Sequence, residues 1–174
     1  MRENVVWRDA SKEELEGSMD TIEQHIFARC FRHVFAPQDS DDALQDRHFN
    51  QKLLALETLS FKSFCGEDDL REPKTMERLI SILSEMAEAL SPTEKAEAVV
   101  QLIKAAAEEH ESNDVLIPIL SWLLVHARDS LGASSLISNI RYIQRFHNPA
   151  RLTGEVAFCL TNLVHQRQLF LMTV

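Results

Sequence analysis

Apolar side chains recur at steps of three and four residues along almost the whole chain, and few residues interrupt them. In residues 13–35, for example, they stand at Leu15, Met19, Ile22 and Ile26, which is the spacing of one face of an α-helix. The 174 residues include only four glycines and five prolines, too few for a β protein with many turns. We therefore predict an all-α fold, a single layered helical bundle of about seven helices.

The same periodicity predicts where the helices lie. The clearest start signal is at Ser91, where Pro92 takes the first helical position and Glu94 completes a capping box. One stretch, 58–73, is less regular and carries no predicted element. The helices are expected at 13–35, 41–57, 74–90, 92–111, 114–127, 135–147 and 155–172.

Charge is distributed unevenly along the chain. The formal net charge is −9, which disfavours nucleic acid as a partner because phosphate binding needs a basic surface. Acidic residues are concentrated in 1–112, whereas 113–174 hold three acidic and five basic residues. We interpret 1–174 as one helical domain, in which 1–112 form acidic, solvated supporting helices and 113–174 form an apolar core with an exposed binding face.

Cysteine spacing and hydropathy indicate a soluble, cytoplasmic protein. Cys30, Cys65 and Cys159 are odd in number and widely spaced, which argues for a reducing compartment. The most apolar run, 116–125, contains a proline and is about half the length of a membrane span. We expect no direct insertion into a membrane.

Motifs for covalent chemistry and for nucleotide-phosphate binding are missing, since the chain has no G-x-S-x-G, no G-x-G-x-x-G and no P-loop. Cys30 and His33 lie one helical turn apart and could share a metal ion. However, no second pair of ligands follows, and Cys30 stands on the apolar stripe. We therefore predict no metal and no cofactor, with Cys30 in the core and the nearby histidines at the surface.

The stretch 113–118 places polar residues at the start of the most apolar helix. Asn113 or Asp114 is a candidate N-cap, but Pro118 would then be the fourth helical residue, where its ring meets the carbonyl four residues back. Either the first turn is irregular, or the helix begins near Ile117 and Asp114 projects from it. A capping role and a functional role for Asp114 both stay open.

The stretch 153–163 opens the last helix. Thr153 can cap it, and Glu155 suits the positive end of the helix dipole. Phe158 and Thr161 are three residues apart and share a face of the helix. Helix packing accounts for these two residues as well as a functional role does.

These motifs resemble the vacuolar-protein-sorting-nine type catalytic domain found in Rabex-like exchange factors. The family pattern has an acidic residue, two or three apolar residues, a proline and an apolar run, as in 114–120 (DVLIPIL). A Ser-Asn pair, an Asn-Pro-x-Arg-Leu and Gly-Glu turn, and a Thr-Asn-Leu follow in order, at 138–139, 148–155 and 161–163. Together with the amino-terminal helices, the resemblance covers most of 18–172.

The resemblance implies a guanine-nucleotide exchange factor for a Rab-family small GTPase of the early-endosomal group, cytoplasmic and peripheral to endosomal membranes. Such a protein promotes GDP release without covalent chemistry and without a cofactor, and we expect it to be a monomer. In the family the acidic residue before the proline is the catalytic one, and Asp114 holds its position. It would be directed at the phosphate-loop lysine and the magnesium site of the GTPase.

Other positions of the family pattern line the GTPase-binding groove, which we expect here between the helices at 114–127 and 155–172. For Asn139, Gly154 and Glu155, a contact role and an architectural role both stay open. The matching residues are Pro118, Asn139, Gly154, Glu155 and Thr161.

The chain departs from the family at Phe158, where the family usually has a tyrosine that is needed for exchange. Phe158 keeps the ring and loses the hydroxyl. If that hydroxyl bonds the GTPase, its loss leaves a group unpaired at about 1–3 kcal/mol, which corresponds to roughly 5- to 150-fold in rate. Two alternatives to an exchange factor with catalytic Asp114 and Phe158 therefore stay open. One is a Rab-binding module of the same fold without efficient exchange, and the other is an unrelated helical scaffold domain.

Overall fold

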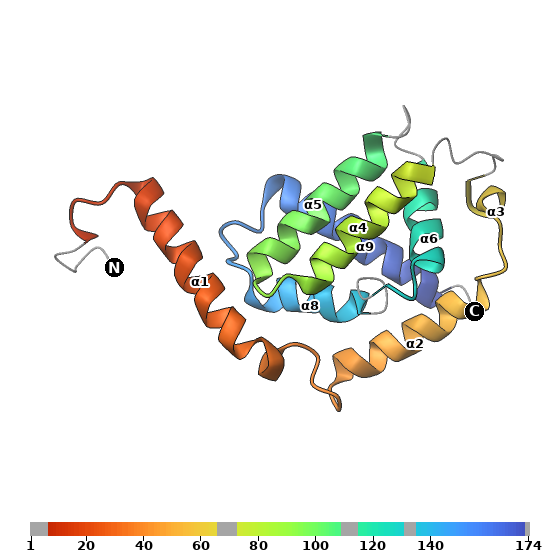
Figure 1. Cartoon of the computed structure of the whole chain (residues 1–174), viewed down its shortest axis with the longest axis horizontal. Helices are drawn as coiled ribbons and strands as arrows, with labels where there is room; N and C mark the ends of the chain where they lie inside the picture. Colours follow the sequence, from red (N-terminus) through yellow and green to blue (C-terminus); the bar gives the residue numbers. More distant parts are fainter. Residues whose placement is uncertain (1–6, 66–72, 109–114, 131–134, 173–174) are drawn as a thin grey trace.

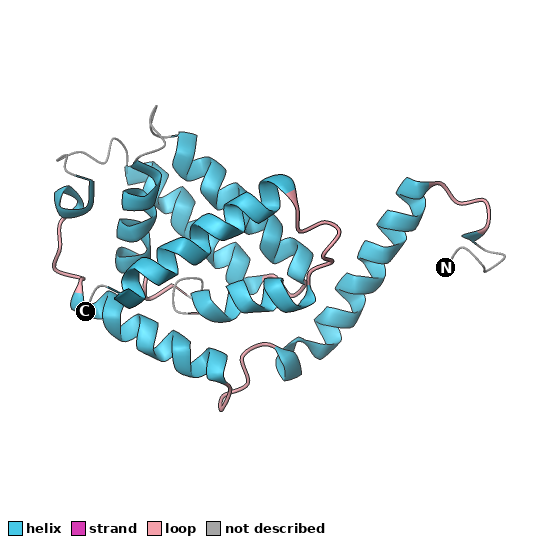
Figure 2. Cartoon of the chain, turned by 180° about the vertical axis from the view of Figure 1, so that it is seen from behind, coloured by secondary structure: helices cyan, strands magenta, loops and turns pink. Residues whose placement is uncertain are grey.

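The computed structural model describes residues 7–65, 73–108, 115–130 and 135–172, and these residues form helices and no strands (Figures 1 and 2). The all-α prediction is confirmed, and each of the seven expected helices is present with ends that differ by a few residues. A short further helix, α3, lies in the stretch that carried no predicted element. None of the described helices is long and apolar enough to cross a bilayer. The helices are α1 (Lys12–Val34), α2 (Asp41–Ala55), α3 (Phe61–Cys65), α4 (Pro73–Glu88), α5 (Pro92–Glu108), α6 (Leu116–His126), α8 (Leu136–Phe146) and α9 (Gly154–Met172).

Local capping signals mark the starts of α2 and α5. At α5 the predicted capping box is present: the Ser91 hydroxyl accepts from the Glu94 N–H at 3.2 Å, and the Glu94 carboxylate accepts from the Ser91 N–H at 3.2 Å. At α2 the Ser40 hydroxyl accepts from the Ala43 N–H at 3.2 Å. These bonds satisfy N–H groups that have no acceptor within the helix.

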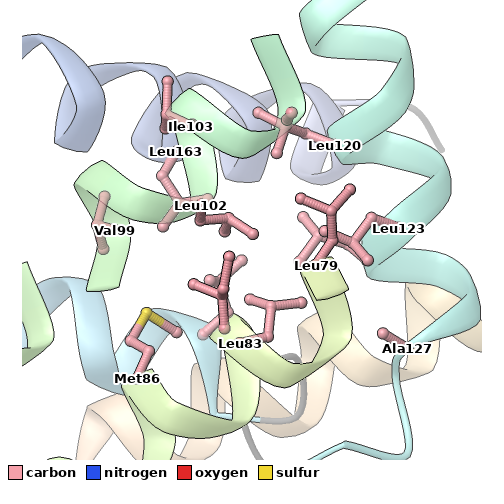
Figure 3. Packing of buried hydrophobic residues seen from close by; sticks show 14 of the residues in the cluster. Leu79, Leu83, Met86, Val99, Leu102, Ile103, Leu120, Leu123, Ala127 and Leu163 are labelled. Atoms are coloured by element: carbon pink, nitrogen blue, oxygen red, sulfur yellow. The ribbon is translucent and has the colours of Figure 1, made fainter. Parts of the chain in front are cut away.

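The core is built around α5, which contacts α4, α6, α8 and α9. Its buried face includes alanines at 96, 98, 105 and 106, and their short side chains allow neighbouring helices to approach closely. α6 was expected to be covered on most sides, and six of its eleven residues are buried. Larger side chains converge on this centre (Figure 3), among them Leu79 and Leu83 of α4, Val99 and Leu102 of α5, Leu120 and Leu123 of α6, and Leu163 of α9.

α2 holds the start of α8 through a carboxylate. Asp46 is only 7% exposed, and its Oδ1 accepts from the backbone N–H groups of Ile137 at 2.8 Å and Ser138 at 3.3 Å. The Ser138 hydroxyl donates to Oδ2. Burial raises the pKa of Asp46, and these donors oppose that effect. The expectation that the acidic helices form a solvated layer is therefore wrong at Asp46 and at Asp42, which is 5% exposed and pairs with arginines of α8.

α1 runs along one edge of the bundle, and its amino-terminal end extends away from the other helices (Figure 1). The rings of Phe27, Phe31 and Phe35 pack against Tyr142 of α8, with centroids 5.5–5.7 Å apart. None of the residues of α1 is buried. The expectation that Cys30 packs in the core is therefore wrong, because its side chain is exposed. The helical period predicted which residues share a face, but not which face would meet another helix.

Lys95 of α5 is completely buried at the junction of α1, α4, α5 and α8. Its Nζ donates to the backbone carbonyls of Met86 at 2.7 Å and Ala87 at 3.2 Å, and to Oδ1 of Asn139 at 2.7 Å. The rings of Phe31 and Phe35 lie 5.2 and 4.8 Å from Nζ, within the range of cation–π attraction. The ammonium group thus satisfies carbonyls in the last turn of α4 that have no donor within their own helix.

Candidate functional site

The first turn of α6 settles how Pro118 is accommodated. The N-cap of α6 is Val115, which makes no side-chain capping bond, and the helix begins at Leu116. Pro118 is thus the third helical residue, in the first turn, where an N–H has no partner in the helix and its loss costs nothing. Asp114 lies outside the described residues. The N-cap of α6 is therefore Val115 and not Asn113 or Asp114, the two candidates from the sequence.

α9 carries Phe158 and Thr161 on an exposed side. The Phe158 side chain is 61% exposed, whereas other apolar residues of this helix, such as Leu163, are buried. Thr161 is exposed, and its hydroxyl donates to the Ala157 carbonyl at 2.7 Å. Because the hydroxyl oxygen keeps its acceptor capacity, Thr161 can still accept a hydrogen bond from a partner.

Gly154 and Glu155 form the exposed start of α9. Gly154 has a φ of 57°, in the left-handed region that favours glycine. Glu155 pairs with Lys104 of α5 at 3.0 Å, with both side chains more than half exposed. Glu155 also lines a cleft of about 440 Å³ between α1, α5 and α9, together with Glu16, Glu97 and Val156. Its carboxylate is therefore accessible to solvent and is paired with the Lys104 ammonium group.

Asn139 lies inside the bundle rather than on its surface. It is 0% exposed, and Oδ1 accepts from Lys95. Its Nδ2 donates to the Ser135 carbonyl and hydroxyl, both at 2.9 Å. All its described bonds are internal, so the geometry favours an architectural role for Asn139 at the first turn of α8.

A polar pair joins α6 to α9 and was not predicted. Gln166 of α9 is 0% exposed, and its Nε2 donates to the Ser121 hydroxyl of α6. The sequence did hold a signal, because Gln166 stands seven residues after Cys159 and three after Leu163, on the apolar face of α9.

The exposed candidate residues lie on one helix, beside a second helix that carries Pro118. α9 carries all four exposed candidates, which are Gly154, Glu155, Phe158 and Thr161. It contacts α6, which carries Pro118. In the part of the chain that the structure describes, no three His, Cys, Asp or Glu side chains converge to hold a metal ion. What the site can offer is therefore an apolar ring, hydrogen-bond acceptors and charge.

Comparison with known proteins assigns this chain to a family. Residues 76–166, about half of the chain, match the vacuolar sorting protein 9 (VPS9) domain. The mouse Rab5 GDP/GTP exchange factor is 30% identical over 162 residues, which cover 87% of this chain and 32% of that protein. The vacuolar protein sorting-associated protein vps901 of Schizosaccharomyces pombe is 24% identical over 179 residues, covering 91% of this chain and 30% of the relative.

The chain therefore spans about a third of the length of these two relatives. The matched segment includes α5, α6, α8 and the greater part of α9, together with nearly all of α4. It contains the first turn of α6 at Pro118, the buried Asn139, and the exposed side of α9 with Phe158 and Thr161. On its fold and on this match, the chain belongs to the VPS9 domain family.

Proposed function

We propose that this chain is a guanine-nucleotide exchange factor for a Rab-family small GTPase of the early-endosomal group. The observation that carries the proposal is the exposure of Phe158. The family resemblance puts a partner-facing residue at this position, and the ring is 61% exposed although α9 buries its other aromatic residue, Phe170. The names of the relatives, among them Rab5 GDP/GTP exchange factors, support the same conclusion.

In this proposal 113–174 form the GTPase-binding helices and 1–112 support them. Phe158 and Thr161 contact the GTPase along α9, and Pro118 shapes the neighbouring start of α6. Gly154 sets the path of the chain into α9, and Glu155 offers charge beside it. Asn139 acts from inside the bundle, by holding the first turn of α8.

Asp114 is the electrostatic element of the proposed mechanism. A carboxylate brought to the phosphate-binding site of the GTPase competes with the nucleotide for the same lysine and magnesium ion. This competition weakens the binding of GDP to the GTPase. The exchange factor accelerates release because it binds the nucleotide-free GTPase most tightly. No covalent step and no cofactor are needed. The protein acts as a monomer at the cytoplasmic face of endosomes, without inserting into the membrane.

The test is release of a fluorescent GDP analogue from a panel of Rab GTPases, with the chain at substoichiometric concentration. We expect each chain to release many GDP molecules from Rabs of the early-endosomal group and few from other Rabs. Absence of acceleration for every Rab in the panel would contradict the proposal.

Asp114→Ala separates the electrostatic role from a structural one. Because Val115 occupies the N-cap of α6, the substitution is expected to leave the melting temperature nearly unchanged. GDP release should fall by at least about 100-fold, as when a charge-stabilising group is removed from a catalytic site. Asp129→Ala, at an exposed acidic residue beyond the other end of α6, is the matched control. Normal release by Asp114→Ala would refute the electrostatic role.

A Rab-binding module without efficient exchange is the second candidate, and Phe158 favours it, since the family usually has a tyrosine there. The same assay distinguishes the two functions. A pure binder forms a complex with nucleotide-free Rab and leaves the release rate unchanged or lower. An unrelated helical scaffold domain forms no such complex with any Rab.

A further inference from the structure

Gln166 is a buried polar residue on a helix face that is otherwise apolar. Its buried neighbours on α9 are Cys159, Leu160, Leu163 and Phe170, and Gln166 itself is 0% exposed. Among the residues that the structure describes, its Oε1 has no hydrogen-bond partner. A buried polar group with an unpaired atom weakens the fold compared with an apolar residue of the same size, so its presence needs a reason other than stability.

The amide of Gln166 is connected to the first turns of α6. The Ser121 hydroxyl donates to the Ile117 carbonyl at 2.9 Å, so its oxygen is the acceptor for the Nε2 of Gln166. The two bonds form a chain from the middle of α9 to Ile117, the residue before Pro118. These hydrogen bonds are directional, whereas apolar packing between helices is not.

Rotation of α9 about its axis would stretch a hydrogen bond between α9 and α6 and so weaken it. Side chains on a helix end roughly 6 Å from its axis, so a rotation of about 20° moves them by about 2 Å. Phe158 and Thr161 stand on the same rigid helix, eight and five residues before Gln166. Displacements of this size are enough to cost a catalytic site about 100-fold in activity.

We propose that Gln166 is a positioning residue for nucleotide exchange: its bond to Ser121 fixes the rotation of α9, and thereby the placement of Phe158 and Thr161 relative to Pro118. The inference rests on the proposed exchange function and adds a determinant that lies below the contact surface. Neither residue needs to touch the GTPase.

The experiment compares variants that are matched in size, Val with Thr and Met with Gln, and that differ in the hydrogen bond. Gln166→Met removes the amide, and Ser121→Val removes the hydroxyl that Ser121→Thr keeps. The double variant Ser121→Val/Gln166→Met makes the pair apolar. Gln168→Met, at an exposed residue of the same helix, is the control. Each variant is measured for thermal unfolding, and for the kcat and KM of GDP release from the Rab that the wild-type chain activates best.

The positioning role predicts that stability and exchange respond differently. Gln166→Met and Ser121→Val should each lower kcat by about tenfold or more, while Ser121→Thr and Gln168→Met stay near wild type. The double variant should regain the thermal stability that Ser121→Val loses, because the Gln166 amide is no longer left unpaired, yet its kcat should stay as low as that of the single variants.

Two results would overturn the inference. If the double variant regains exchange along with stability, or if Gln166→Met exchanges as fast as wild type, Gln166 contributes to folding alone. If the wild-type chain accelerates no Rab, the proposed function itself fails and the positioning role fails with it. The wild-type measurement therefore separates the two kinds of failure.

Discussion

At the scale of single residues, Phe158 is the most informative side chain for locating the candidate site. Helix packing and a functional role explained it equally well from the sequence, and its 61% exposure removes packing as the explanation. An exposed phenylalanine gains about 1.5–3 kcal/mol when a partner covers it fully. This gain makes the ring a strong candidate for a binding contact.

Phe158→Tyr restores the residue that the family usually carries. The new hydroxyl would lie at an exposed position, so the free energy of unfolding should change by less than about 0.5 kcal/mol. If the chain is a weakened exchange factor, the catalytic efficiency of GDP release should rise, by up to roughly 150-fold for one restored hydrogen bond. GDP release and thermal melting of the same preparations provide the check.

Phe158→Ala is the companion variant, because it removes the ring as well. It should release GDP more slowly than wild type while melting at a similar temperature. If Phe158→Tyr releases GDP no faster and Phe158→Ala no more slowly than wild type, the ring does not contact the GTPase.

At the scale of helices, two ends are satisfied by side chains from other helices. Asp46 of α2 accepts from the first turn of α8, and Lys95 of α5 donates to the last turn of α4. Each charge has the sign that the helix dipole favours at that end. These two side chains therefore fix how α2 meets α8 and how α5 meets α4.

Asp46→Ala should be strongly destabilising. It leaves the N–H groups of Ile137 and Ser138 without their acceptor in a buried position, at about 1–3 kcal/mol for each group. We expect a loss of about 2–5 kcal/mol in urea denaturation. Asp41→Ala is the control, because Asp41 is exposed and its pair with Arg141 lies at the surface, where such pairs contribute about 1 kcal/mol or less. Equal losses for the two variants would contradict the capping role.

The contrast between local and distant signals explains what could be predicted. Periodic apolar residues and the Ser91 capping box depend on neighbours in sequence, so the long helices and the start of α5 were correct. α3 is only five residues long, too short to show a period. The burial of Asp46 and Lys95 depends on other helices, including partners roughly 45 to 90 residues away, and charge alone predicts exposure. The candidate site was reached through motifs, whereas its buried support at Gln166 needed the packing of α6 on α9.

At the scale of the whole molecule, Lys95 connects α1, α4, α5 and α8. Burial lowers its pKa to about 7, and the neighbouring Glu94 partly opposes this shift. The folded chain therefore releases a proton above about pH 7 that the unfolded chain keeps until about pH 10.4. Unfolding takes up a proton between these values, so a rise in pH favours the folded state.

The expected result is a free energy of unfolding that rises by about 2 kcal/mol between pH 7 and pH 9. Lys95→Met should lack this increase, and Lys104→Met, at an exposed lysine of the same helix, should keep it. Tyr142 and Cys159 also titrate in the alkaline range, and burial raises the pKa of both. Their effect has the opposite sign, because the unfolded chain loses these protons first, at about pH 8.5 for the thiol and about pH 10 for the phenol. It therefore lowers stability only near and above the upper end of this pH range. Urea denaturation at several pH values measures the slope. A slope shared by wild type and Lys95→Met would show that another group is responsible.

The alanines of α5 have a consequence for how such a chain can evolve. Every other side chain except glycine is larger than alanine, so nearly any replacement at 96, 98, 105 or 106 would wedge apart helices that touch α5. Selection should remove mutations at these alanines because they destabilise the fold. The exposed side of α9 can change without disturbing the fold. A lineage could therefore acquire a new partner by drift on α9 while α5 stays the same.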